Sequence, residues 1–332
     1  MSLDGKILGQ ARAQHAEQKL AHETSLQKRR ETVYIELPRL REIDQALQNT
    51  VRDTIQIALT QGENPAARLD AIGAKNQALQ AESHNILLEN GYPADYLDHM
   101  PFCSLCNDFG HSGTGLCSCL RDIYRILQAK ELSSLLNLGE ENFDVFSLDF
   151  YDDRTIDPRF GMTARENMAE ILAFCRRYAD TFGLASMNLF FVGAPGLGKT
   201  FLSACIAKVV SESGFSVVYD TAGNLFTRFE AEKFGRSEDP EAAQSEINRY
   251  LGCDLLILDD LGTEMTTSFV VSTLYALINT RLTHKKPTIM SSNYSLEALA
   301  SKYSPQIMSR LEGEYEVLTF FGRDIRKLKK EL

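Results

Sequence analysis

The chain has 332 residues, of which 44% are hydrophobic, so it can bury a sizeable core and is long enough for two domains. It contains no apolar run of membrane-spanning length and does not start with a signal-peptide pattern, so we expect a cytoplasmic protein with no membrane partner. The net charge of −10 excludes a protein that coats nucleic acid non-specifically along its whole surface, although it allows a local basic groove.

The first part of the chain carries helical patterns. Residues 1–35 are polar and of mixed charge, which indicates either a solvated helix or a disordered arm. Apolar residues recur at helical spacing over 38–55 and again over 69–86, which predicts two antiparallel helices, and a third helical stretch covers about 120–138. Stripes of this kind usually form a core, so we assign them no chemistry.

Four cysteines gather in the middle of this region. Seven cysteines in a cytoplasmic chain are not expected to form disulfides, so the cluster needs another explanation. Cys103 and Cys106 have a spacing that places both sulfurs on one tetrahedral ion, and Cys117 and Cys119 supply a second pair. The stretch between the pairs is almost devoid of apolar residues, so a bound metal would hold it folded. We therefore predict a structural zinc site (Zn²⁺) with either four cysteine ligands or three cysteines and His111.

A complete phosphate-binding loop occupies residues 193–200, between an apolar strand pattern at 188–192 and a helical pattern at 202–210. Its glycines let backbone N–H groups and the helix N-terminus face the phosphates of ATP. Lys199 then reaches the β- and γ-phosphates, and the Thr200 hydroxyl can bind Mg²⁺. The predicted nucleotide contacts are Gly193, Ala194, Pro195, Gly196, Leu197, Gly198, Lys199, Thr200 and Phe201.

An acidic pair follows a second strand pattern further along the chain. The apolar run 255–258 ends in Asp259 and Asp260, and parallel strands place such residues beside the phosphates at the carboxyl edge of the sheet. We expect Asp259 to hold Mg²⁺ through water and Asp260 to orient or deprotonate the attacking water. A further strand at 288–291 leads to Asn293, whose side chain can bridge that water and the γ-phosphate.

With these residues in place, the second half of the chain resembles the AAA+ helicase-loader family. That family includes bacterial loaders of the replicative helicase and helper ATPases of IS21-type transposons. The resemblance rests on 254–264, 291–293 and 309–311 and covers roughly residues 140–332. It implies an α/β fold, a P-loop NTPase parallel sheet of the AAA+ type at 141–332 without a helical lid, preceded by a helical, zinc-binding docking domain at 1–140 whose cysteine module is 103–119.

The resemblance also implies roles for individual residues. Asn293 matches the sensor-1 residue, and Arg310 matches an arginine finger that reaches the γ-phosphate of a neighbouring subunit. Arg326 matches the sensor-2 arginine, with Arg323 as the alternative. AAA+ ATPases most often carry Asp-Glu where this chain has Asp-Asp at 259–260, although Asp-Asp is not foreign to the loader family, so a slow ATPase would be unsurprising.

Aromatic and basic residues interleave in the segment 221–236. Such residues can stack on bases and contact the backbone of single-stranded DNA, and the family resemblance implies a single-strand-binding insertion at about this place. The alternative is an amphipathic helix whose aromatic residues lie in the core and whose basic residues are solvated. The residues concerned are Phe226, Arg228, Phe229, Lys233, Phe234 and Arg236.

Together, these features predict an ATP-dependent loader of a hexameric replicative helicase. The chain would hydrolyse ATP to ADP and phosphate at the interfaces of an ATP-dependent homo-oligomer around single-stranded DNA. An IS21-type transposition helper would share almost every residue of the second half. A nucleotide-gated adaptor with vestigial hydrolysis is the remaining alternative.

Overall fold

The computed structural model describes residues 3–59, 65–113, 115–136, 142–237 and 239–331. Contacts divide the chain into two compact units: Arg12–Leu120 forms one, and the residues before Arg12 join those after Leu120 in the other. These units differ from the expected boundary at residue 140, because the first residues and the helix that follows the cysteines belong to the same unit as the rest of the chain. None of the helices in the described part of the chain combines the length and apolar composition that a membrane span requires.

The unit Arg12–Leu120 is built mainly from helices. α1 (Gly5–Glu36) covers most of the first 35 residues, so a helix rather than a disordered arm forms there. α2 (Pro38–Leu59) and α3 (Pro65–Glu89) match the two predicted helices. Arg39 Nε donates to Glu82 Oε1 at 2.7 Å, which joins the start of α2 to the end of α3, as antiparallel helices require. The buried residues that these helices share with the following turn are Val33, Leu40, Ile43, Leu87 and Leu97.

Short elements surround the cysteines. β1 (His111–Ser112) pairs with β2 (Gly115–Leu116) in an antiparallel arrangement, and α4 (Ser118–Leu136) begins between Cys117 and Cys119. The third predicted helix is therefore present.

The other unit contains a five-stranded sheet with the order β6-β7-β8-β5-β9, in which every pair is parallel. The strands are β5 (Asn188–Gly193), β6 (Val217–Thr221), β7 (Leu255–Asp259), β8 (Thr288–Ser292) and β9 (Tyr315–Phe320). The predicted α/β class and parallel sheet are thereby confirmed. All strands end at one edge, which is where an α/β protein binds its ligand.

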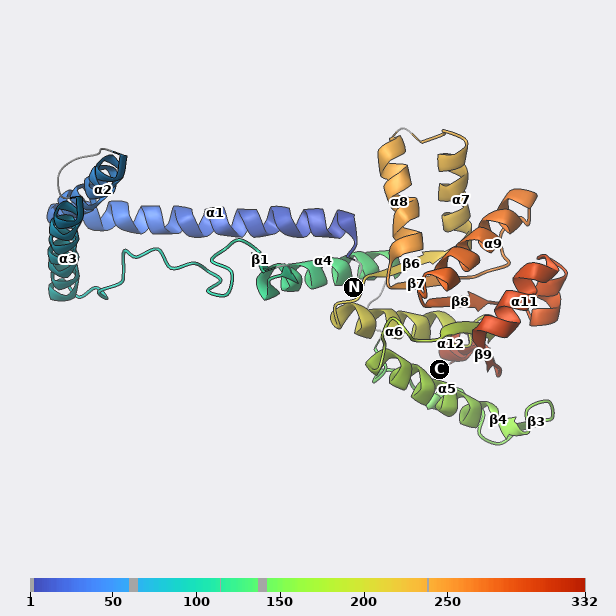
Figure 1. Cartoon of the computed structure of the whole chain (residues 1–332). Coiled ribbons are helices and arrows are strands. Elements are labelled where there is room, and N and C mark those ends of the chain that lie inside the picture. The colour runs from blue at the N-terminus through green and yellow to red at the C-terminus, as the bar shows by residue number, and fades with distance from the viewer. Residues whose placement is uncertain (1–2, 60–64, 114, 137–141, 238, 332) are drawn as a thin grey trace. The chain divides into compact units, whose positions relative to one another are not determined.

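Helices connect these strands and cover both faces of the sheet (Figure 1). They are α5 (Ala164–Asp180), α6 (Lys199–Glu212), α7 (Ala222–Lys233), α8 (Pro240–Gly252), α9 (Ser268–Thr283), α10 (Leu296–Ala300), α11 (Pro305–Glu314) and α12 (Ile325–Glu331). Before α5 lie a single 3₁₀ turn, η1 (Leu148–Phe150), and a small antiparallel pair, β3 (Ile156–Asp157) and β4 (Met162–Thr163).

The side chains of each strand pack alternately into two hydrophobic cores, one on each face of the sheet. On β5, Leu189 and Phe191 pack with α5 and α6, whereas Phe190 and Val192 pack with α7, α8 and α9 on the opposite face. Successive residues of a strand point to opposite faces, so a continuous apolar strand serves both layers.

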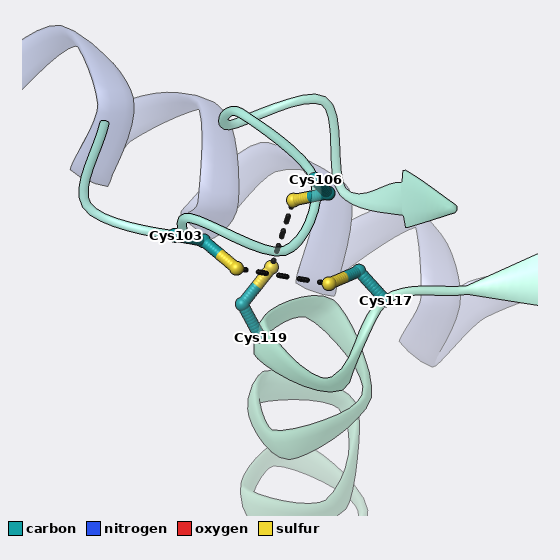
Figure 2. A group of neighbouring side chains, drawn as sticks. All are labelled: Cys103, Cys106, Cys117 and Cys119. Carbon is teal, nitrogen blue, oxygen red and sulfur yellow. Dashed lines mark hydrogen bonds between the residues drawn. The ribbon is translucent and has the colours of Figure 1, made fainter. Parts of the chain in front are cut away.

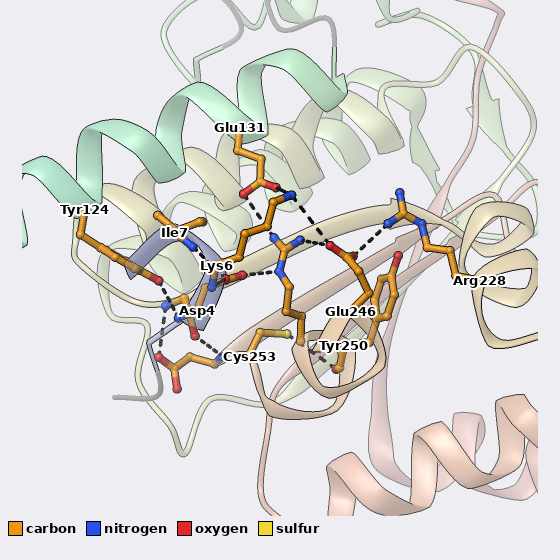
Figure 3. A network of polar contacts seen from close by, with 12 residues as sticks. Asp4, Lys6, Ile7, Tyr124, Glu131, Arg228, Glu246, Tyr250 and Cys253 are labelled. Atoms are coloured by element: carbon orange, nitrogen blue, oxygen red, sulfur yellow. Dashed lines mark hydrogen bonds and ion pairs between the residues drawn. The ribbon is translucent and has the colours of Figure 1, made fainter. Parts of the chain in front are cut away.

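A buried ionic network attaches the first residues of the chain to the sheet unit (Figure 3). Arg249 of α8 pairs with Asp4, with Glu131 at 3.2 Å and with Glu246 at 2.8 Å. The Asp4 backbone N–H donates to the Tyr124 hydroxyl at 2.9 Å. The Asp4 and Arg249 side chains are only 4% and 11% exposed, so Asp4 depends on Arg249 for its charge compensation, whereas Arg249 also has Glu131 and Glu246.

Candidate nucleotide site and cysteine cluster

The phosphate-binding loop follows β5 at the carboxyl edge of the sheet, and its glycines have no substitute there. Gly193 has φ of 154°, and a Cβ on it would lie 2.2 Å from the Phe320 carbonyl oxygen of β9. Gly196 has φ of 78°, and a Cβ on it would lie 1.8 Å from Asp324 Oδ1. The loop is therefore packed against the residues that follow β9, and only glycine allows this approach.

Lys199, the first residue of α6, is folded back onto the loop. Its Nζ donates to the carbonyl oxygens of Gly193 and Ala194 at 2.7 and 2.9 Å and to Asn293 Oδ1 at 2.8 Å. Burial lowers the pKa of Lys199 to about 8, and the nearby carboxylates Asp259 and Asp260 oppose this shift. The Lys199 ammonium therefore donates its hydrogen bonds to uncharged acceptors. The phosphate of a bound nucleotide would provide the negative charge that these acceptors lack.

Asp259 ends β7 and is held by three hydroxyl groups. Thr200 Oγ1 donates to Asp259 Oδ2 at 2.9 Å, and the Tyr219 hydroxyl donates to the same oxygen at 2.7 Å. The Ser291 hydroxyl bonds to the other oxygen, Oδ1. The two residues predicted to serve Mg²⁺, Thr200 and Asp259, are therefore in contact with each other.

Asp260 adopts an unusual backbone conformation, with φ of 58°. Its Oδ1 accepts from Asn293 Nδ2 at 2.9 Å, and its backbone N–H donates to Ser291 Oγ at 3.2 Å. Burial and the adjacent Asp259 carboxylate raise the pKa of Asp260. A carboxylate with a raised pKa at the mouth of the site is suited to accept a proton from water.

Of these side chains, Lys199, Thr200, Asp260 and Asn293 border a cavity of about 320 Å³. The phosphate-binding loop from Pro195 to Phe201, Asp260, Asn293 and Arg326 line it, as the predicted site requires. Arg323 is not among the lining residues, so the structure favours Arg326 over its alternative. Arg310 is also absent from the lining; it lies on α11, is 45% exposed and pairs with Glu314 at 3.6 Å.

One wall of the cavity was not anticipated from the sequence. It comes from the segment 145–151 and from α12, and it combines aromatic rings with aliphatic side chains. The ring of Phe146 lies 5.9 Å from that of Tyr151 in a stacked arrangement and 5.6 Å from that of Phe201. The sequence feature that could have indicated this wall is the group of aromatic residues at 146–151, which precedes the phosphate-binding loop. The lining residues of this wall are Val145, Phe146, Ser147, Phe150, Tyr151, Ile325 and Lys329.

The four clustered cysteines converge in the unit Arg12–Leu120 (Figure 2). The sulfurs of Cys103 and Cys117 are 3.7 Å apart and those of Cys106 and Cys119 are 3.6 Å apart. All four sulfurs lie within 4.8 Å of one another. A disulfide needs about 2.05 Å, whereas four sulfurs at about 2.3 Å from a central zinc are separated by about 3.8 Å. The cluster therefore fits a tetrahedral zinc ion.

Backbone N–H groups donate to two of the clustered sulfurs and favour their thiolate form, whereas burial raises the pKa of the Cys106 and Cys119 thiols. The Gly110 N–H donates to Cys106 Sγ at 3.3 Å. A hydrogen bond from the Cys119 N–H lowers the pKa of the Cys117 thiol to about 7. His111 does not join the group; its Nδ1 lies 2.9 Å from the Phe109 carbonyl oxygen, so the geometry favours four cysteines over the His111 alternative.

The segment 221–236 divides into two parts. In the first, Phe226 is buried in the core, as the amphipathic-helix alternative requires, and the 44% exposed side chain of Arg228 pairs with Glu246 at 2.9 Å. In the second, Phe234 is 54% exposed, and the guanidinium of Arg236 lies 5.5 Å from the centre of its ring. Lys233 similarly lies 5.1 Å from the ring of Phe269 on α9. The exposed end of α7 is therefore where the aromatic and basic side chains face solvent.

Part of the chain that holds this site is similar to known proteins. Residues 167–328, a little under half of the chain, match the IstB-like ATP binding protein family. The replicative helicase loader DnaC of Escherichia coli K12 is 25% identical over 159 residues, which are 48% of this chain and 64% of DnaC. The replicative helicase loader DnaI of Bacillus subtilis is 26% identical over 181 residues, 53% of this chain and 54% of DnaI.

A solved structure of the DnaC helicase loader matches 53% of this chain and 96% of that one, with 23% identity and a TM-score of 0.43. The chain spans less than two thirds of the length of these curated relatives.

Proposed function

We propose that the chain, whose residues 167–328 match the IstB-like ATP binding protein family, is an ATP-dependent loader that places a hexameric replicative helicase on single-stranded DNA. The observation that carries this proposal is that Lys199, Asp260 and Asn293 line one cavity, with Asp259 bonded to Thr200 of the same lining. The similarity to DnaC and DnaI supports the loader activity. A cytoplasmic location is part of the same proposal.

The positions of these side chains support the proposed ATP hydrolysis. Mg²⁺ bound by Thr200 and, through water, by Asp259 would neutralise phosphate charge. Lys199 would transfer its hydrogen bonds from the loop carbonyls to the phosphates. Asp260 would then accept a proton from the water that Asn293 orients, and Arg326 would face the developing charge on the γ-phosphate.

We propose that Arg310 acts on the cavity of a neighbouring subunit. It lies outside the cavity of its own chain, is half exposed, and has only an exposed partner, Glu314, at 3.6 Å among its ion pairs in the described residues. Arg310→Ala and Lys199→Ala chains should each hydrolyse ATP poorly alone, whereas a mixture should recover activity at mixed interfaces. Glu314→Ala is the matched control and should retain activity. No recovery in the mixture would argue against a subunit-interface site.

We propose that the unit with the cysteine cluster docks on the helicase. The test is capture of the host replicative helicase by the full chain, before and after treatment with a zinc chelator. Loss of capture after chelation, with ATP binding retained, would support docking through this unit. Unchanged capture after complete zinc removal would exclude it.

The exposed end of α7 is the proposed contact with single-stranded DNA. Phe234→Ala together with Arg236→Ala should weaken binding of a fluorescent single strand by about tenfold or more, since stacking on one base contributes about 1–3 kcal/mol. Arg228→Ala is the control, because Arg228 lies earlier on α7 and pairs with Glu246 at 2.9 Å. Equal loss in both variants would place the DNA contact elsewhere.

A transposition helper is the alternative that the IstB-like match itself favours. Such a protein would assemble with ATP on duplex DNA and ignore the helicase. A sedimentation assay with duplex and single-stranded DNA separates the two functions. ATP-dependent filaments on duplex DNA without helicase capture would replace the loader proposal.

The third function, a nucleotide-gated adaptor, requires binding but no turnover. Asp260→Asn removes the proposed base while leaving the loop intact. A wild-type turnover no higher than that of Asp260→Asn would favour the adaptor.

A further inference from the structure

Tyr219 is a buried tyrosine whose hydroxyl ends at the Mg²⁺ carboxylate. It lies on β6, is 4% exposed, and packs in the core shared with α5 and α6. Its hydroxyl donates to Asp259 Oδ2 at 2.7 Å and lies 3.2 Å from Ser203 Oγ. The alternation of the strand explains this position, because the register pairs Tyr219 with Ile257 and places its side chain on the face opposite to that of Asp220.

In the hydrogen bond between Tyr219 and Asp259, only the tyrosine can be the donor. An ionised carboxylate only accepts hydrogen bonds, so the tyrosine must donate. The tyrosine hydroxyl lies at hydrogen-bond distance from this carboxylate and from Ser203, so it is held in place as the donor. Thr200 donates to the same carboxylate oxygen, but Thr200 is itself a predicted ligand of Mg²⁺ and would turn away to bind the ion.

We propose that Tyr219 is a positioning residue for magnesium: it holds the Asp259 carboxylate in the orientation that receives the Mg²⁺–nucleotide complex after Thr200 has turned to the metal. Ser291 fixes Oδ1 of the same carboxylate, so Tyr219 and Ser291 together define its plane. Hydrogen bonds behind a metal-binding group orient it and commonly change metal affinity by about 10- to 100-fold when removed. This inference rests on the proposed ATP site.

The test compares Tyr219→Phe with Tyr250→Phe in the full chain. Tyr250 is the matched control, because it is also buried and its hydroxyl donates at 2.5 Å to a neighbouring β6 carboxylate, Asp220, away from the nucleotide cavity. Binding of a fluorescent ATP analogue is measured across a Mg²⁺ titration and also in excess chelator. Tyr219→Phe should raise the half-saturating Mg²⁺ concentration about 10-fold or more and leave the metal-free nucleotide affinity unchanged.

Three outcomes have distinct meanings. An unchanged Mg²⁺ requirement in Tyr219→Phe, or the same increase in Tyr250→Phe, would overturn the proposal. A wild-type chain that binds no nucleotide at any Mg²⁺ concentration would instead overturn the proposed ATP site. If thermal unfolding shows that Tyr219→Phe does not fold, 3-fluorotyrosine at position 219 replaces it, because this residue keeps the ring and has a hydroxyl that is a stronger donor. The half-saturating Mg²⁺ concentration should then fall. An unchanged value would overturn the proposal.

Discussion

Lys199 Nζ donates to Asn293 Oδ1 at 2.8 Å, and this bond joins the start of α6 to the residue that follows β8. The amide of the same asparagine donates to Asp260 Oδ1 at 2.9 Å. Asn293 therefore connects the group that would hold the phosphates to the carboxylate that would activate water. A change in one of these contacts is expected to alter the other.

Asn293→Ala should separate binding from turnover. Nucleotide affinity should change little, because the loop and Lys199 remain, whereas kcat should fall about 100-fold with the loss of a positioned donor. Asn224→Ala is a matched control, since Asn224 makes a similar 3.0 Å bond to Asp220 on β6 away from the nucleotide cavity. An equal loss of nucleotide affinity and kcat in Asn293→Ala would contradict the assigned role.

The same variant should shift the pH profile of turnover. Burial and Asp259 raise the pKa of Asp260, while the hydrogen bond from Asn293 lowers it. A base must be ionised, so turnover rises as pH increases through this pKa. Without Asn293 the pKa rises further, and the acid limb of the kcat profile should move to higher pH. A limb that stays in place would show that Asp260 is not the titrating group.

Nucleotide affinity should fall as pH rises through about 8, the value to which burial lowers the pKa of Lys199. Above that pH the amine loses the charge that attracts phosphate. The free energy of unfolding should respond in the opposite sense, because the unfolded chain binds more protons than the folded one between about 8 and the usual lysine pKa. Fluorescent-nucleotide titrations should give a sloping profile for the wild type and a flat one for Lys199→Arg.

Removal of a single cysteine should release the metal from the cluster. Cys106→Ser is expected to abolish zinc binding and to lower the melting temperature, since the surrounding turn has little core of its own. His111→Ala should retain one zinc per chain, because Nδ1 of His111 contacts the Phe109 carbonyl oxygen instead of the cluster. Metal analysis of the purified full chain measures both. Zinc loss in His111→Ala would restore the Cys₃His ligand set.

Arg249→Met should destabilise the sheet unit by about 3 kcal/mol, because it leaves the buried Asp4 carboxylate without its cation. Lys6→Met is the control: the Lys6 side chain is 50% exposed and pairs with Glu131 at 3.4 Å, so its loss should cost at most about 1 kcal/mol. Denaturant unfolding followed by near-UV signals compares the two. Equal effects would mean that the attachment of the first residues does not depend on Arg249.

The sequence predicted the groups of the candidate site that depend on short spacings along the chain. The loop 193–200, the strand that ends in Asp259 and Asp260, and the cysteine pairs each place their groups through the geometry of a single turn or strand end. The alternation of apolar segments likewise predicted the parallel sheet. For residues 1–35, by contrast, the sequence does not decide between a helix and a disordered arm, because their polar composition suits both; the structure has a helix over most of them.

The tertiary structure decided what depends on residues distant in the chain. Tyr219 is 40 residues from Asp259, and only the pairing of β6 with β7 brings its hydroxyl to that carboxylate. The wall formed by 145–151 and α12 closes the cavity from two ends of the domain. The fold of the chain after β9 likewise places Arg326, and not Arg323, in the lining of the cavity. A sequence pattern specifies local backbone geometry, whereas contacts between separate elements depend on how the whole sheet packs.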